Sequence, residues 1–172
     1  MAKTKMTYLF CLDDHRNLAD EVRKRFDDTS RYKVESFYSM DEFIIHFRKG
    51  LEPASCKIAI LSVPETKEKL TEYNELAIEL KKLEPRSGII LLYTQQMADD
   101  IRKIIVYNID AYVPVNQNSV LRIHNAVKKI ISENNISINR SLRNISVYVL
   151  TGFLIITLLG LLIIYLKFPR LF

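Results

Sequence analysis

Short apolar runs alternate with amphipathic helical patterns over the first 131 residues. Five runs have the length of a buried strand: Thr7–Leu12, Tyr32–Phe37, Lys57–Leu61, Ile89–Tyr93 and Ala111–Val113. After each run, apolar residues recur at the spacing of one helical face. These stripes are Leu18, Val22 and Phe26; Met40, Phe43, Ile44 and Phe47; Leu70, Tyr73, Leu76, Ala77, Leu80 and Leu83; Ile101, Ile104 and Ile105; and Val120, Ile123, Val127, Ile130 and Ile131. Strands that alternate with helices predict an α/β fold with a parallel sheet covered on both faces.

The C-terminal end of the sequence has a different pattern. Residues 147–166 contain no charged side chain, and as a helix they would span about 30 Å, the thickness of the hydrocarbon core of a bilayer. A soluble helix of this length would keep a polar stripe. The sequence therefore predicts a single transmembrane helix at 147–166, which binds the lipid bilayer, followed by a short tail at 167–172.

Basic residues flank this segment unequally. Lys128, Lys129, Arg140 and Arg143 precede it, whereas Lys167 and Arg170 follow it. This excess places the N-terminal part in the cytoplasm, on a single-pass protein of the cell (inner, cytoplasmic) membrane. The N-terminus has no apolar stretch typical of a signal peptide.

Residues 132–146 are polar with scattered isoleucines. They are either a polar linker or an extension of the last helix. Ile131, Ile138 and Ile145 recur every seven residues, which is typical of a weak coiled coil.

The composition excludes several classes of protein. The chain has 172 residues, a net charge of +5, two cysteines and three histidines, which excludes a disulfide scaffold and a dense zinc module. It has no Walker loop, no Gly-rich dinucleotide turn and no nucleophile elbow. No helix-turn-helix is appended, so no nucleic acid is expected as a partner. Cys11 and Cys56 fall on buried strands, where core packing is the expected role.

In a parallel sheet of this kind, ligands bind at the carboxyl ends of the strands, beside the switch in strand order. The residues at these ends are Asp13, Asp14, Ser62, Thr94 and the stretch after Val113. They are the candidate site.

The motifs of residues 6–131 resemble the receiver domain of two-component response regulators. The matching residues are Asp13-Asp14 after the first strand, Ile60 to Pro64 at the end of the third, Thr94 at the end of the fourth, and Asp110 to Val113 through the fifth. The resemblance implies a flavodoxin-like, five-stranded parallel sheet with strand order 2-1-3-4-5. It also implies a Mg²⁺-binding pair at Asp13 and Asp14 and switch-like residues at Thr94 and Tyr112.

Two reactive positions of the receiver pattern are altered. The phosphoacceptor position, normally an aspartate, falls on Ser62, and the position of the lysine falls on Val115. A serine hydroxyl is a weak nucleophile without a neighbouring base, and valine cannot neutralise a developing phosphoryl charge. The resemblance therefore implies a degenerate pseudo-receiver that is not an enzyme, has no catalytic residues, and has no cofactor beyond a weak Mg²⁺ site at Asp13 and Asp14.

The expected function is that of a membrane-tethered, non-phosphorylated module in signal transduction that binds another protein. The resemblance suggests another receiver or a histidine kinase as the partner, and residues 99–131 as the interaction face. A second copy of the same chain, forming a homodimer, is a further possible partner. Two alternatives remain: a phosphorylatable switch that uses divergent residues, and a small-molecule sensor in the pocket near Asp13, Ser62 and Thr94.

Overall fold

The computed structural model describes residues 6–13, 16–49, 55–64, 66–103 and 108–167. Within these ranges, the side chains of residues 160–167 and of a few other helical positions are not described.

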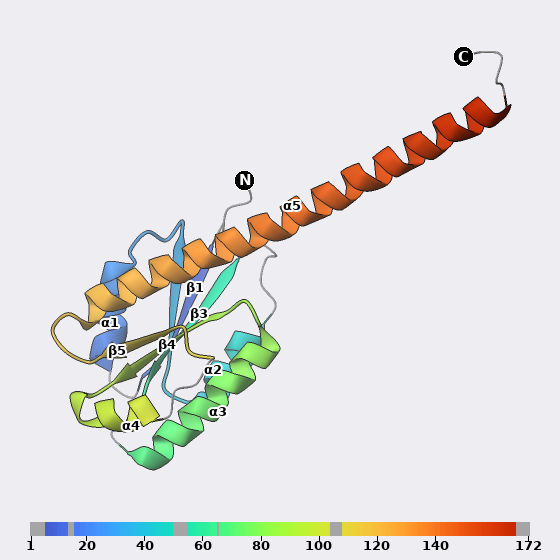
Figure 1. The fold of residues 1–172 in the computed structure, drawn as a ribbon. Coiled ribbons are helices and arrows are strands. Elements are labelled where there is room, and N and C mark those ends of the chain that lie inside the picture. The colour runs from blue at the N-terminus through green and yellow to red at the C-terminus, as the bar shows by residue number, and fades with distance from the viewer. Residues whose placement is uncertain (1–5, 14–15, 50–54, 65, 104–107, 168–172) are drawn as a thin grey trace. The chain divides into compact units, whose positions relative to one another are not determined.

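A five-stranded parallel sheet forms the centre of the first part of the chain (Figure 1). Its strands are β1 (Thr7–Leu12), β2 (Tyr32–Phe37), β3 (Cys56–Ser62), β4 (Gly88–Tyr93) and β5 (Ala111–Pro114). They are ordered β2-β1-β3-β4-β5, and every neighbouring pair is parallel. The predicted strands and the flavodoxin-like order 2-1-3-4-5 are confirmed.

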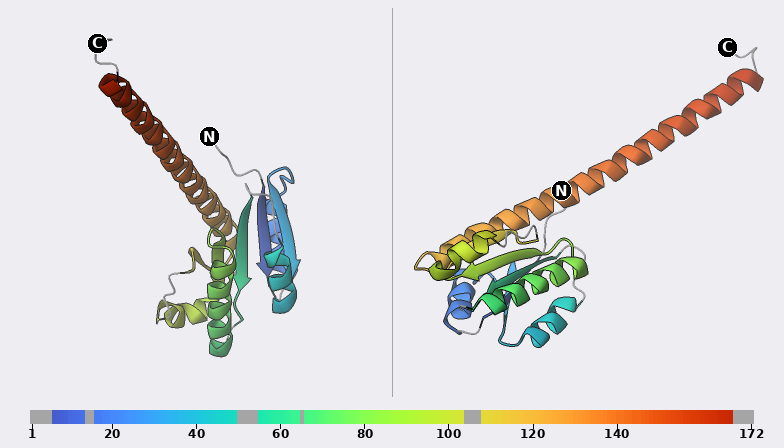
Figure 2. Two further views of the ribbon diagram at one scale, coloured as in Figure 1. Left: turned by 90° about the vertical axis from the view of Figure 1, so that its right-hand side faces the viewer. Right: turned by 60° about the horizontal axis from the view of Figure 1, so that its bottom comes forward.

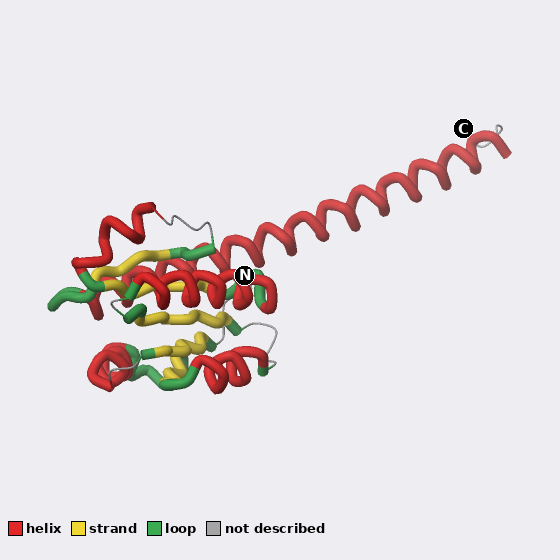
Figure 3. The backbone as a smooth tube through the Cα atoms, turned by 90° about the horizontal axis from the view of Figure 1, so that it is seen from below, coloured by secondary structure: helices red, strands yellow, loops and turns green. Residues whose placement is uncertain are grey.

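Helices cover both faces of the sheet (Figures 2 and 3). They are α1 (Arg16–Arg25), α2 (Met40–Arg48), α3 (Lys67–Leu83), α4 (Ala98–Lys103) and α5 (Ser119–Lys167), with the 3₁₀ turn η1 (Gln95–Met97) before α4. The side chains of each strand alternate between two cores. Phe10 and Leu12 pack with residues of α2, α3 and α4, whereas Leu9 and Cys11 pack with residues of α1 and the first part of α5.

Two expectations about the helices need correction. Leu83 was expected on the buried stripe of α3, but it is the last residue of the helix and is 42% exposed. In the sequence, Ser39 and Glu42 have the spacing of a capping box, which predicts that the Ser39 side chain caps the helix that follows. Ser39 does precede α2, but its side chain makes no capping hydrogen bond, and its carbonyl accepts from the Phe43 N–H at 3.0 Å. Ile104 and Ile105 lie outside the described residues.

Helix α5 continues through residues 132–146 and ends at Lys167. The chain divides into two compact units, Ala2–Asn135 and Ile136–Phe172. Among the residues with described placement, no helix qualifies as long and apolar enough to cross a membrane. The last seven residues of the predicted span, 160–166, have side chains that are not described. The transmembrane helix stays a prediction.

Gly88, the first residue of β4, lets α5 lie close to the sheet. A Cβ atom at this position would lie 2.6 Å from Cγ2 of Ile130. We expect Gly88→Ala to lower the free energy of unfolding by about 1–2 kcal/mol, because overpacking forces the Ile130 side chain or α5 to shift. Chemical denaturation measures this change. The penalty should shrink when Ile130→Ala is already present, and an equal penalty in both backgrounds would contradict the close contact.

Candidate functional site

Asp13 lies at the carboxyl end of β1, next to the edge strand β2. Its N–H donates to the carbonyl of Phe37 at 3.2 Å, and the residue is only 4% exposed. The structure thus places one carboxylate of the predicted acidic pair where β1 ends. Asp14, the second member, lies outside the described residues.

Ser62 and Thr94 end the next two strands of the sheet. Ser62 is the last residue of β3 and is in register with Leu92 of β4. Thr94 follows β4, and its carbonyl accepts from the Met97 N–H at 3.0 Å as η1 begins. Because β1, β3 and β4 are adjacent and parallel, the structure brings Asp13, Ser62 and Thr94 to the same edge of the sheet. The Thr94 hydroxyl oxygen is buried and has no hydrogen-bond partner among the described residues.

Val115 follows β5 at the same edge. Its N–H donates to the Tyr93 carbonyl at 2.7 Å, and its side chain is 45% exposed. Next to it, the Asn116 N–H donates to Oγ of Ser119 at 2.6 Å, where α5 begins. These backbone bonds hold an apolar, uncharged side chain at the position that the sequence resemblance assigns to the receiver lysine.

Tyr112 lies on β5, in register with Leu91 of β4. It is half-buried and packs against the core cluster on the α2, α3 and α4 side of the sheet. The ring therefore has a packing role, and its switch-like role stays a prediction.

The described oxygen donors at this edge fit Mg²⁺ poorly. Mg²⁺ prefers several hard oxygen ligands, usually including carboxylates. Asp13 supplies a carboxylate. Ser62 supplies only a neutral hydroxyl, where a second carboxylate would bind the ion better. In the described part of the chain, no three or more His, Cys, Asp or Glu side chains form a group that could hold a metal ion. Asp14 and His15 lie outside that search.

Both cysteines are buried in the sheet. Burial, with a smaller contribution from the Asp13 charge, raises the pKa of the Cys11 thiol to about 12. Burial also raises the pKa of Cys56. Since the thiolate is the reactive form, both residues are poor nucleophiles and poor redox groups at neutral pH.

A buried lysine that the sequence analysis did not single out lies at the opposite, amino-terminal edge of the sheet. Lys57 is 7% exposed, and its Nζ donates to the carbonyls of Phe47 at 2.7 Å and Lys49 at 3.0 Å. Lys57 thereby provides hydrogen bonds to backbone carbonyls at the end of α2. Burial lowers the pKa of the Lys57 amine. The sequence carried one signal of this role, namely that Lys57 is the only charged residue of β3.

Asp110 is a second residue whose role the sequence did not show. Its carboxylate accepts from the Ile89 N–H at 2.7 Å and forms an ion pair with Lys81 Nζ at 2.9 Å. Its own N–H donates to the Ile89 carbonyl at 2.9 Å. Asp110 therefore joins the starts of β4 and β5 and the end of α3, which is a structural role.

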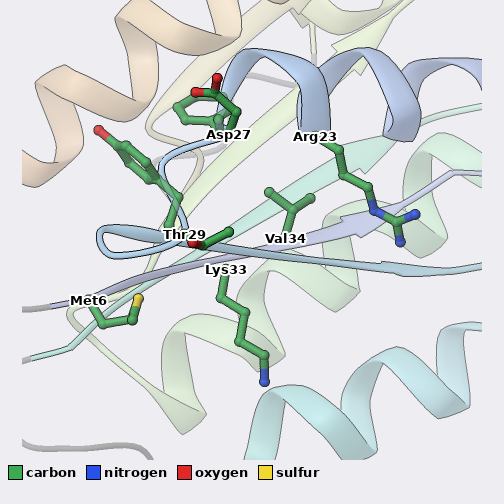
Figure 4. Close-up of a pocket in the computed structure, with 8 residues that line it drawn as sticks. Met6, Arg23, Asp27, Thr29, Lys33 and Val34 are labelled. Carbon is green, nitrogen blue, oxygen red and sulfur yellow. The ribbon is translucent and has the colours of Figure 1, made fainter.

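A surface pocket of about 310 Å³ lies beside α1 and β2 (Figure 4). Arg23, Phe26, Tyr32 and Lys33 are among its lining residues. Both of its cations have partners: Arg23 donates to Ser36 at 3.1 Å, and Lys33 pairs with Glu35 at 2.8 Å. The pocket lies at the amino ends of the strands, so it is separate from the edge that holds Asp13, Ser62 and Thr94.

The sequence matches no protein-family model and no curated protein. Solved structures do match. A response regulator receiver domain protein from Clostridium thermocellum has a TM-score of 0.57 and 14% identity, over 76% of this chain and 98% of that one. A CheY-like receiver domain protein from Methanospirillum hungatei has a TM-score of 0.54 and 16% identity, over 77% and 98%. A protein from Rhodopirellula baltica, described as an adenylate cyclase, has a TM-score of 0.56 and 12% identity, over 80% and 95%.

These similarities identify the fold as that of response regulator receiver domains. At such low identities they show the fold and not the chemistry.

Proposed function

We propose that the chain is a membrane-tethered pseudo-receiver, a signalling module that binds a protein partner without being phosphorylated and that is not an enzyme. The observation that carries this proposal is the pair of residues at the reactive positions of the receiver fold. Ser62 ends β3 and the half-exposed Val115 follows β5, so these two positions supply neither an acyl-phosphate acceptor nor a cation.

The physical reason is the charge of a transferring phosphoryl group. A carboxylate can attack phosphorus and form an acyl phosphate, whereas an unassisted serine hydroxyl is a weak nucleophile. Charge that develops on the phosphoryl oxygens needs a positive partner, which Val115 cannot provide. Asp13 then serves as a remnant of a weak Mg²⁺ site, and Thr94 and Tyr112 are proposed as switch-like residues that a partner, rather than a phosphoryl group, would act on.

The apolar segment 147–166 and the basic residues before it support the tether. The proposed location is the cell membrane, with the receiver-like part in the cytoplasm. Confinement to a membrane raises the local concentration of the module, so even a weak partner would be bound there.

The proposed interaction face is residues 99–131, which include β5 and the start of α5. Val115 and Leu121 are exposed apolar side chains on this stretch, at 45% and 51%. We propose another receiver or a histidine kinase as the partner, and no nucleic acid.

Phosphorylation can be tested directly on the full-length chain. We expect no mass increase after incubation with Mg²⁺ and a small-molecule phosphodonor such as acetyl phosphate, because the acceptor carboxylate and the cation are absent. Intact-mass spectrometry measures the result, and a conventional receiver treated in parallel is the positive control. A stable acyl phosphate on this chain would support the alternative of an active switch with divergent residues and would rule out the proposal.

A further inference from the structure

The second compact unit, Ile136–Phe172, carries apolar residues at heptad spacing. Along α5, one series of mostly apolar residues is spaced alternately four and three positions apart. We call this set the heptad seam: Ile138, Leu142, Ile145, Val149, Gly152, Ile156 and Leu159. Such spacing keeps one stripe of a helix directed at a neighbouring helix over many turns.

The polar start of this unit shows that the seam is more than a consequence of an apolar composition. Residues 136–146 are mostly polar, and three of their four apolar residues, Ile138, Leu142 and Ile145, occupy successive seam positions, whereas Ile136 lies off the seam. Ile145 is 57% exposed within the single chain. A solvated segment gains nothing from regularly spaced apolar residues, so the pattern indicates a partner helix.

The apolar part of the unit continues the seam at a position without a side chain. Apart from Gly152 itself, its two neighbours and the adjacent backbone of the same helix, no atom lies within 4 Å of where a Cβ of Gly152 would be, so a second backbone can approach there. Thr151 and Thr157 lie off the seam, and their hydroxyls donate within the helix, to Val147 at 2.9 Å and to Leu154 at 2.9 Å. The contact expected along the seam is therefore apolar packing.

We propose that the heptad seam binds the same seam of a second copy of this chain, as a parallel homodimer. The parallel orientation rests on the proposed membrane tether, because two copies anchored by the same C-terminal span point the same way. Each seam position then meets its counterpart around a twofold axis.

Charge along the segment is compatible with this self-association. Arg140 and Arg143 fall outside the seam and its flanking positions. The flanking positions in the polar part are Asn139, Ser141 and Ser146, which are uncharged. Two copies can therefore meet without like charges opposite each other, whereas a charged partner helix would find no complementary residue beside the seam.

Cysteine cross-linking of the full-length chain in membranes tests the dimer. We compare Ile145→Cys, on the seam, with Arg143→Cys, off it, after oxidation by copper phenanthroline. Native Cys11 and Cys56 are each 1% exposed, so the unmodified chain gives the background. We expect several-fold more disulfide-linked dimer from Ile145→Cys than from Arg143→Cys.

A second pair of variants tests the close approach at Gly152. In the Ile145→Cys chain, Gly152→Leu should lower the yield several-fold, because a bulky side chain separates the two backbones. Thr151→Leu, the off-seam control, should leave the yield unchanged. Three results would each overturn the dimer. The first is an equal yield of cross-linked dimer from the seam and off-seam cysteines. The second is an equal effect of Gly152→Leu and Thr151→Leu on that yield, and the third is cross-linking only to a different protein.

Membrane retention is measured on the same samples by washing with alkaline carbonate. Release of the chain from the membrane pellet would overturn the tether, whatever the cross-linking yields. Retention in the pellet with equal seam and off-seam yields would overturn the dimer alone. The two proposals can thus fail separately.

Discussion

Phe47→Ala is expected to lower the free energy of unfolding by about 3–5 kcal/mol, the cost of removing a buried aromatic side chain. Phe47 lies on α2 and is 0% exposed. Its ring centroid lies 5.4 Å from that of Phe10 on β1 and 5.8 Å from that of Phe43. Lys57 Nζ lies 5.3 Å from the same ring centroid. Alanine would leave a cavity among these groups and remove an aromatic contact of a buried lysine.

Urea denaturation of the full-length chain in mild detergent measures this loss. Tyr38→Ala is the matched control, since Tyr38 is aromatic but 52% exposed, and its replacement should change stability by about 0.5 kcal/mol or less. Similar losses for the two variants would contradict the placement of the core between the sheet and α2.

Asp110→Ala is expected to lower the free energy of unfolding by about 1.5–3 kcal/mol, the range for a hydrogen bond that involves a charged group. The substitution leaves the Ile89 N–H without its acceptor and Lys81 without its ion-pair partner. Asp110 is 31% exposed at its side chain, so solvent screens part of the ionic contribution and the lower half of the range is favoured.

Asp110→Asn separates the hydrogen bond from the charge. It keeps an oxygen that can accept from the Ile89 N–H, so its loss should be smaller than that of alanine. Thermal and urea denaturation of both variants give the comparison. An asparagine variant as unstable as the alanine variant would show that the ion pair with Lys81, and not the bond to β4, dominates.

The strands β1, β3 and β4 could be predicted because each is a short apolar run that the sheet buries on both faces. The edge strands β2 and β5 are only partly buried. β3 and β4 are buried at nearly every position. All five predicted runs became strands: β1 and β2 have the predicted ends, and the ends of β3, β4 and β5 differ from the prediction by at most one residue. Leu83 was misplaced because a helical stripe does not say where the core ends. Leu80 is 0% exposed, whereas Leu83, the last residue of α3, is 42% exposed.

The site could be predicted in part because parallel strands end at one edge. That rule alone places Asp13, Ser62 and Thr94 together. Lys57 and Asp110 escaped prediction because their partners are mainly backbone groups brought close by the fold, namely the carbonyl of Phe47 and the N–H of Ile89. No side-chain pattern in a sequence marks a backbone partner.

The most direct test of a receiver fold without phosphoryl chemistry is the melting temperature of the full-length chain in Mg²⁺ and beryllofluoride. Beryllofluoride mimics a bound phosphoryl group, so its binding depends on the preformed site and not on the rate of phosphorylation. With Ser62 and Val115 at the reactive positions, we expect the same melting temperature with and without it. A rise that grows with beryllofluoride concentration and requires Mg²⁺ would show a working phosphoryl site and would contradict the pseudo-receiver.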